Sequence, residues 1–187
     1  MNQPGLPLLY RIGDLSVVGF FLVNLLFITY IVDLEQLVIA DPTHFQYPLW
    51  PPSALIDLVH WYGSSFDPVL MARPMWWKMT IWIDVLFFGP FYVVAIYAFL
   101  SRKNWIRIPA IIYSSVMMTN VTIILGEEVA GAHATPHLPL VLALNAPWLL
   151  FPLYILLRMW SHERPFIVLE PSLAPLGLLS EAEGAIE

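Results

Sequence analysis

The residues best suited to chemistry in this chain are acids that stand inside or beside long apolar segments. Asp84 lies in the run 81–86, where its neighbours are Ile, Trp, Val and Leu. A carboxylate in the middle of a membrane costs about 2.5–3.5 kcal/mol even on a lenient scale, so such a residue must face the protein interior. We expect Asp84 to line a pocket, and the alternative is a structural hydrogen bond to a neighbouring helix.

Two further acids flank the apolar segments. Asp33 ends the first of them, and Asp67 follows the aromatic stretch 61–66 and precedes Pro68. Taken alone, Asp33 is also compatible with a solvated helix end, and Asp67 with a loop turn. If these acids converge, repulsion and burial would keep at least one protonated, and the cluster would titrate as a unit.

The last apolar segment carries a polar residue, Asn145, with Trp148 three residues later on the same helix face. Asn145 either lines the pocket or holds two helices together. Pro147 in this segment, and the pair Gly89-Pro90 in the second segment, interrupt the helical hydrogen bonds and favour a cavity beside them.

Four segments must position these residues, and each has the length of about 20 residues that a membrane-spanning helix needs. The chain is 59% hydrophobic and only 12% charged, so water is not its main solvent. Backbone groups in lipid must be satisfied within the segment, which leaves helices. We therefore predict an all-α, multi-pass integral membrane protein with a four-helix bundle and an intramembrane pocket; its helices cover about 15–34, 77–100, 106–125 and 138–160.

The remaining segments predict the domain organisation. Residues 1–14 form a cytoplasmic N-terminus, 15–164 the transmembrane domain, and 165–187 a disordered cytoplasmic tail without a periodic pattern. The long connection 35–76, rich in Pro and aromatic residues, is predicted to lie on the non-cytoplasmic side as a lid over the bundle. The short connection 126–137 is expected to hold Glu127 and Glu128 in a loop.

Composition excludes several classes of function. The chain has no Cys, which removes disulfides, thiol nucleophiles and thiolate metal sites. A net charge of −6 leaves no basic surface for nucleic acid. His133 and His137 have the spacing of a helical metal pair, but Pro136 between them favours a loop, so we expect no metal site. No phosphate-binding loop is present in the sequence, and we expect no cofactor.

A family resemblance rests on the stretch 97–100 followed by 104–114, which reads Tyr-Ala-Phe-Leu and then Asn-Trp-Ile-Arg-Ile-Pro-Ala-Ile-Ile-Tyr-Ser. It resembles the EXPERA superfamily, four-helix membrane proteins that include the emopamil-binding protein, a sterol Δ8–Δ7 isomerase, and the sigma-2 receptor. The resemblance spans roughly residues 15–160. Weaker matches follow at 33–34, 61–62, 67–68 and 145–152.

The resemblance implies roles for residues of this chain. Asp33 and Asp67 would face the ammonium group of a ligand, while Asp84, Asn145 and Trp148 would line the deeper part of the same pocket. Where the isomerase has a His, one turn before the acid of its first helix, this chain has Thr29, which cannot shuttle a proton at neutral pH. Both helix acids of the isomerase are glutamates, and both are shorter aspartates here. These departures place the chain closer to the sigma-2 receptor branch.

Three functions remain open on the sequence. The leading prediction is a membrane-embedded binding protein for sterol-like lipids and amphiphilic amines. The second is a sterol or isoprenoid isomerase or cyclase, in which Asp84 protonates an alkene and Asp33 stabilises the cation. The third is a scaffold for a partner membrane protein. The host membrane would be the endoplasmic reticulum of a eukaryote or the cell membrane of a bacterium, and a homodimer stays open.

The distribution of basic residues predicts the orientation of the helices. Six of the eight basic residues fall on the side of the termini and of the turn 101–105, and only Arg73 and Lys78 fall on the other side. Cytoplasmic loops carry the excess of Lys and Arg, so that side is cytoplasmic. Reporters fused after Glu187 and inserted between Ser101 and Asn104 should both report the cytoplasm. A non-cytoplasmic signal from either reporter would refute this topology.

Overall fold

The structure, a computed structural model, describes residues 8–166, and within this range it contains helices but no strands. Four helical stretches are long and apolar enough to cross a membrane: Arg11–Val38, Met75–Leu100, Asn104–Ala130 and Leu138–Ser161. The predicted all-helical architecture with four spanning segments is confirmed. The predicted tail 165–187 lies almost entirely outside the described residues, as does the start of the N-terminal segment.

The first two spanning helices each contain a π-helical segment, with one extra residue per hydrogen-bonded turn. The first helix runs through α1 (Leu8–Val23), the π-helical η1 (Asn24–Asp33) and α2 (Leu34–Val38). The second runs through α5 (Met75–Ile83), the π-helical η2 (Asp84–Phe88) and α6 (Gly89–Leu100). Such segments frequently occur at functional sites.

The causes of the two irregular segments can be read from the sequence around them. Pro90 has no N–H group to donate to the carbonyl four residues earlier, so the α-helical register cannot continue through η2. At the start of η1, the side chain of Asn24 donates to the carbonyl of Phe20 over 2.8 Å and competes with the backbone for this acceptor.

The third and fourth spanning helices are also composite. The third consists of the short 3₁₀ turn η3 (Asn104–Ile106) and α7 (Arg107–Ala130), and the fourth of α8 (Leu138–Asn145) and α9 (Pro147–Ser161). The expectation that Glu127 and Glu128 lie in a loop is wrong, because α7 continues through them. After Pro109 in the first turn of α7, no Pro occurs before Pro136, so the three polar or small residues at 126–128 do not end the helix.

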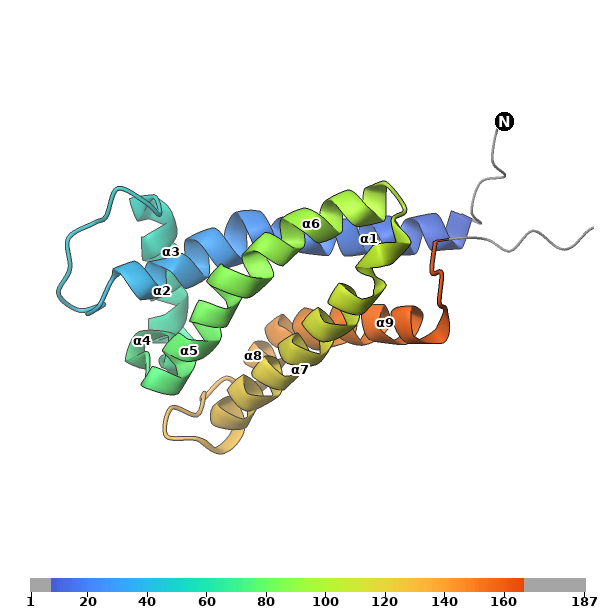
Figure 1. Cartoon of the computed structure of the whole chain (residues 1–187). Helices are drawn as coiled ribbons and strands as arrows, with labels where there is room; N and C mark the ends of the chain where they lie inside the picture. Colours follow the sequence, from blue (N-terminus) through green and yellow to red (C-terminus); the bar gives the residue numbers. More distant parts are fainter. Residues whose placement is uncertain (1–7, 167–187) are drawn as a thin grey trace, which may run out of the picture.

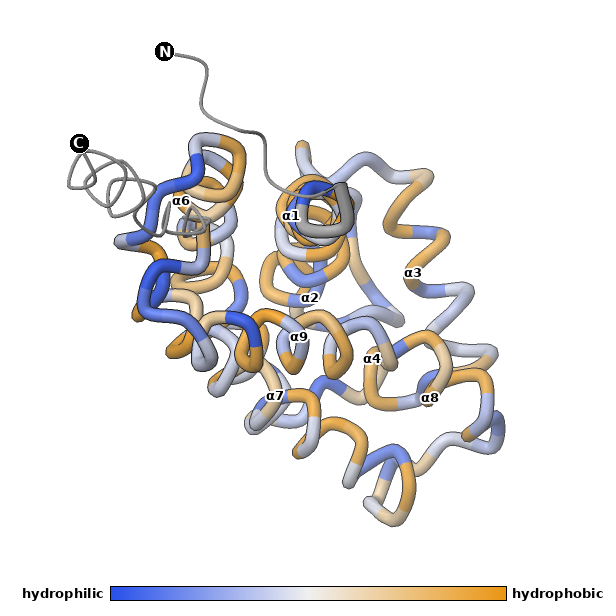
Figure 2. The backbone as a smooth tube through the Cα atoms, turned by 90° about the vertical axis from the view of Figure 1, so that its right-hand side faces the viewer, coloured by the Kyte–Doolittle hydropathy of each residue, from blue (hydrophilic) through white to orange (hydrophobic). Residues whose placement is uncertain are grey.

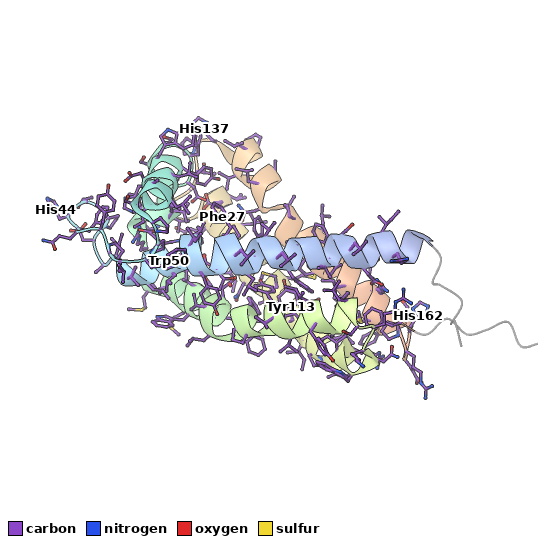
Figure 3. The ribbon with its side chains drawn as sticks, turned by 90° about the horizontal axis from the view of Figure 1, so that it is seen from above. Phe27, His44, Trp50, Tyr113, His137 and His162 are labelled. Atoms are coloured by element: carbon purple, nitrogen blue, oxygen red, sulfur yellow. The ribbon has the colours of Figure 1, made fainter. Side chains whose placement is uncertain are left out.

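The long connection between the first two spanning helices folds into two short helices, α3 (Ser53–Ser65) and α4 (Pro68–Ala72). Figure 1 shows them at one end of the bundle, near α2 and α5, whereas the turn between α6 and α7 and the end of α9 lie at the other end. Figure 3 marks the first end with His44, Trp50 and His137 and the opposite end with His162. We call α3, α4 and the loop before them the lid.

The outer faces of the spanning helices are apolar. Leu86 is 66% exposed, and Leu26 and Leu150 are similarly exposed. Figure 2 shows hydrophobic colour on both the inner and the outer sides of these helices. Water would disfavour such a surface, whereas hydrocarbon accommodates it. The chain is therefore an integral membrane protein.

A buried ion pair fastens the lid to the first helix. The guanidinium of Arg73 donates from Nη2 to Oε1 of Glu35 over 2.7 Å and from Nη1 to the carbonyl of Ile39 over 2.6 Å. A ring nitrogen of His60 lies 2.7 Å from the same Glu35 oxygen. Glu35 is completely buried, so its charge depends on these partners.

Replacing Arg73 tests this attachment. Arg73→Met leaves the buried Glu35 carboxylate without its guanidinium, and it should lower the free energy of unfolding by about 3–5 kcal/mol. The measurement is unfolding of the purified protein in detergent, followed by tryptophan fluorescence. The double variant Glu35→Gln/Arg73→Met should recover more than half of the loss, because no buried charge remains. An unchanged Arg73→Met variant would contradict the role of this ion pair.

Candidate ligand-binding site

A cavity of about 420 Å³ lies between the lid and the spanning helices, and η1, η2, α3, α7 and α8 all contribute to its walls. Small-molecule sites typically have volumes of about 300–1,000 Å³, so the cavity suits a ligand of that class. Its walls are mostly apolar and rich in aromatic rings; these rings are those of Phe27, Trp61, Tyr62, Trp77, Phe88 and Trp148. In Figure 3, Phe27 lies between the lid end and Tyr113.

The first acid pair of the cavity consists of Asp33 and Asp84. The two residues come from the adjacent segments η1 and η2, line the cavity, and are only 7% and 8% exposed. Their carboxyl groups are hydrogen-bonded to each other. The buried Thr29 hydroxyl donates to Oδ1 of Asp84 over 2.5 Å. A hydrogen bond between two carboxyl groups requires a proton on at least one of them, so this pair carries at most one negative charge.

The second acid pair consists of Asp67 and Glu128. Asp67 lines the cavity from the start of α4, is 6% exposed, and is hydrogen-bonded to Glu128, which is 1% exposed. Burial raises the pKa of Asp67 above its ordinary value of 3.8, against the opposing effect of hydrogen bonds from Glu128 and from backbone N–H groups. The pKa of the neighbouring Tyr62 is raised to about 12 by burial and by the charges of Asp67 and Glu128.

The sequence did not single out Glu128 as a site residue. Val121 and Ile124 on α7 line the cavity. Glu128 comes seven residues after Val121 and four residues after Ile124, which places it on the same face of the helix. Extending the helical period past Gly126 would have identified it. Asn120 lies on the same face of α7 and lines the cavity. The sequence did not indicate this position, because an uncharged amide costs less to bury in a membrane than a carboxylate does.

These two pairs differ from the other buried acids of the described chain in their partners. Asp14 is ion-paired with Arg158, and Glu35 with Arg73. Within residues 8–166, no Lys, Arg or His lies within ion-pair distance of the four acids of the two pairs, which are Asp33, Asp84, Asp67 and Glu128. Buried charges are normally paired, so the cavity and its border concentrate buried acids that have no cationic partner among the described residues.

The other predicted residues have identifiable positions. Trp148 lines the cavity, and its indole N–H donates to Oδ1 of Asn24 over 2.7 Å, which joins the fourth helix to the first. Asn145 also lines the cavity, and its amide donates to the carbonyl of Val141 in its own helix. Whether Thr29, Asp33, Asp67, Asp84, Asn145 and Trp148 contact a ligand stays a prediction.

The two acids named together by the family resemblance, Asp33 and Asp67, are not partners of each other. Each pairs with a different acid along one cavity. His133 bonds Glu127 through its ring over 2.9 Å, and among residues 8–166 no three His, Asp or Glu side chains are grouped to hold a metal ion.

A family model and individual relatives both relate this chain to the same family of membrane proteins. The sequence profile of EXPERA (EXPanded EBP superfamily) matches residues 54–159. The chain is 34% identical over 148 residues to Sigma intracellular receptor 2 of Xenopus tropicalis, covering 73% of this chain and 82% of that protein. It is 32% identical over 159 residues to the Homo sapiens protein of the same name, covering 76% of this chain and 85% of that protein.

The second acid pair predicts a pH dependence of stability. The pKa of Asp67 is higher in the folded than in the unfolded state, so its stabilising contribution is complete below the unfolded pKa of 3.8 and is lost as the pH rises through the folded pKa. Asp67→Asn, which cannot ionise, should therefore flatten the fall of the unfolding midpoint that accompanies a rise in pH above about 4. Thermal unfolding in detergent at a series of pH values measures this change in the midpoint.

The matched control is Asp57→Asn, at an exposed acid of the lid. It should keep the pH profile of the unmodified protein. Equal slopes for the unmodified protein and for Asp67→Asn would show that Asp67 is not part of this titration.

Proposed function

The chain belongs to the EXPERA superfamily, and on this premise we propose that it is a sigma-2 receptor-like binding protein for sterol-like lipids and amphiphilic amines. The observation that carries the proposal is the apolar cavity, whose buried acids have no cationic partner within residues 8–166. Apolar walls favour a flat hydrophobic body through the area removed from water, about 25 cal/mol for each Å². The acid pair supplies a charge partner that is strong because the site is dry.

An amphiphilic amine fits the first acid pair through its ammonium group. With one proton in its mutual hydrogen bond, the pair of Asp33 and Asp84 would carry one negative charge beside a bound amine, and a single ammonium group neutralises that charge. Thr29 fixes Asp84 from the side of the first helix, so Asp33 is the group that meets the ligand. The ring faces of Phe27 and Trp148 would flank the cation or the hydrophobic body.

A sterol-like lipid uses the same cavity without a charge. Its hydroxyl group would donate to a carboxylate oxygen of the pair or accept from the amide of Asn120. Its fused rings would pack against the aromatic walls, which supply most of the affinity.

The placement in the membrane is part of the proposal. Residues 15–164 form the ligand-binding unit, the lid end faces the non-cytoplasmic side, and the opposite end with six basic residues faces the cytoplasm. The host membrane is the endoplasmic reticulum in a eukaryote or the cell membrane in a bacterium. No cofactor is needed for this function.

A binding role suits the site better than isomerisation. An isomerase must add a proton at one carbon and remove one from another, which needs two groups that exchange protons near neutral pH. The hydroxyl of Thr29 does not ionise in that range, and it is held as a donor to Asp84. The pair of Asp33 and Asp84 already shares its proton internally.

The experiment removes the charge of the first pair and compares an amine with a sterol. The double variant Asp33→Asn/Asp84→Asn leaves a buried ammonium without a charge partner, so the affinity for dodecylamine should fall by more than about tenfold. Cholesterol carries no charge, and its affinity should change by less than about threefold. Each single variant retains one carboxylate and should lose less than the double variant. Binding isotherms on the full chain in lipid nanodiscs measure these affinities.

Asp57→Asn controls for the same chemical change outside the cavity and should bind both ligands like the unmodified protein. Retained cholesterol binding shows that the double variant is folded. Unchanged dodecylamine affinity in the double variant would mean that the amine only partitions into the lipid, and the proposed site would be abandoned.

A further inference from the structure

A second, smaller cavity lies between the start of α1 and the end of α6, which Figure 1 shows at the end of the bundle opposite the lid. Its volume is about 110 Å³, and it shares no lining residue with the candidate ligand-binding site. Sites that enclose a drug-sized molecule have volumes of about 300–1,000 Å³. This cavity therefore suits one small chemical group rather than a whole ligand.

Two arginines make this cavity cationic. Arg11 lines it from α1, and Arg102 lines it from the turn after α6. Within residues 8–166, no Asp or Glu lies within ion-pair distance of either guanidinium group. Asp14 also lines the cavity, but it is ion-paired with Arg158, so that pair adds no net charge. The cavity thus offers the charge of two guanidinium groups to an anion.

The cavity lies at the boundary between hydrocarbon and lipid headgroups. Arg11 is the first residue of the first spanning stretch, and Arg102 comes two residues after Leu100, the last residue of the second. Leu15 and Leu100 line the same cavity and are 57% and 59% exposed. The surface is therefore cationic at the level of the headgroups and apolar beside it, where acyl chains lie. This combination fits an anionic lipid better than a soluble anion.

The backbone at Arg102 gives independent support for a role of its side chain. The N–H of Lys103 donates to the carbonyl of Ala98 over 2.8 Å, and the N–H of Arg102 donates to the carbonyl of Phe99 over 3.4 Å. This is the hydrogen-bond pattern of a Schellman turn, in which Gly usually occupies the left-handed position. Arg102 occupies it here with φ of 52°. A residue with a Cβ atom costs stability there, so the guanidinium group is placed at this position against the local backbone preference.

We propose that this cavity binds the phosphate group of phosphatidic acid from the leaflet at this end of the bundle, which is the cytoplasmic leaflet in the predicted orientation. A phosphate monoester carries about 1.5–2 negative charges at neutral pH, which two guanidinium groups match. Each planar guanidinium can donate to two phosphate oxygens at once. Basic pockets between spanning helices are known to hold anionic headgroups. The inference goes beyond the proposed function, because this site lies outside the ligand cavity.

The test is native mass spectrometry of the full chain in detergent, titrated with phosphatidic acid or with phosphatidylcholine of the same acyl chains. The first phosphatidic acid molecule should bind at least about tenfold more tightly than phosphatidylcholine. The double variant Arg11→Gln/Arg102→Gln should lose this preference. An unmodified protein that binds both lipids equally would overturn the proposal.

The matched control is Lys103→Gln/Arg164→Gln. It removes the same charge from the same end of the bundle, at two exposed residues that do not line the cavity. This variant should keep the preference for phosphatidic acid. An equal loss in both double variants would show that a diffuse basic surface attracts the lipid, and the cavity would be excluded. Inorganic phosphate should not displace the lipid at equal concentration, because it has no acyl chain. Complete displacement by phosphate would overturn the assignment to a lipid.

Arg102→Gly tests the site in a variant that should fold at least as well as the unmodified protein. Gly relieves the left-handed backbone, so the midpoint of thermal unfolding should rise, while the affinity for phosphatidic acid should fall by about threefold or more. Higher stability with unchanged lipid affinity would remove Arg102 from the site. Dodecylamine should bind the Arg11→Gln/Arg102→Gln variant like the unmodified protein, because neither arginine lines the ligand cavity. The proposed function and this inference can therefore fail independently.

Discussion

Hydrocarbon offers no hydrogen-bonding partner to a polar group, and this constraint determines where the polar residues of the bundle lie. Each must find its partner within the protein. Asp14 forms an ion pair with Arg158, and Glu35 forms one with Arg73. The indole N–H of Trp148 donates to Asn24. The four remaining buried acids of residues 8–166 pair with one another, and each such pair holds a proton in place of a cation. The same constraint that keeps charge off the lipid-facing surfaces therefore concentrates acid around the cavity.

The irregular helical segments make this concentration possible. They place the acids of the first and second helices opposite each other, and Gly89 allows the helices to approach closely at that level. A Cβ atom at Gly89 would lie 2.7 Å from the hydroxyl oxygen of Tyr30 and 3.2 Å from Cγ2 of Thr29. A larger residue would push Thr29 away from Asp84 and weaken the support of the acid pair. Pro90 and Gly89 thus act on the site through the backbone, without lining it.

Much of the fold followed from the sequence, because the thickness of the hydrocarbon core dictates the length of an apolar helix. The inward position of Asp84 followed from the cost of a charge in lipid. The partners of the acids did not follow, because they depend on how each helix is rotated about its axis, and helices that are apolar on all sides do not encode that rotation. Glu128 was missed for a different reason. The polar stretch 126–128 resembles the end of a helix, but α7 continues to Ala130, and Glu128 is hydrogen-bonded to Asp67.

The attachment of the lid by Glu35 and Arg73 also bears on the route to the cavity. Lifting the lid from the aqueous side would separate the completely buried carboxylate of Glu35 from the guanidinium of Arg73. This separation has a high free-energy cost, which disfavours entry of a ligand by that route. Between the spanning helices, the buried ion pair of Asp14 and Arg158 lies at the end of the bundle opposite the lid. An amphiphile is already dissolved in the surrounding bilayer. Occupancy then follows the concentration of the ligand in the lipid phase, so two compounds of equal intrinsic affinity will occupy the site according to how strongly each partitions into the membrane.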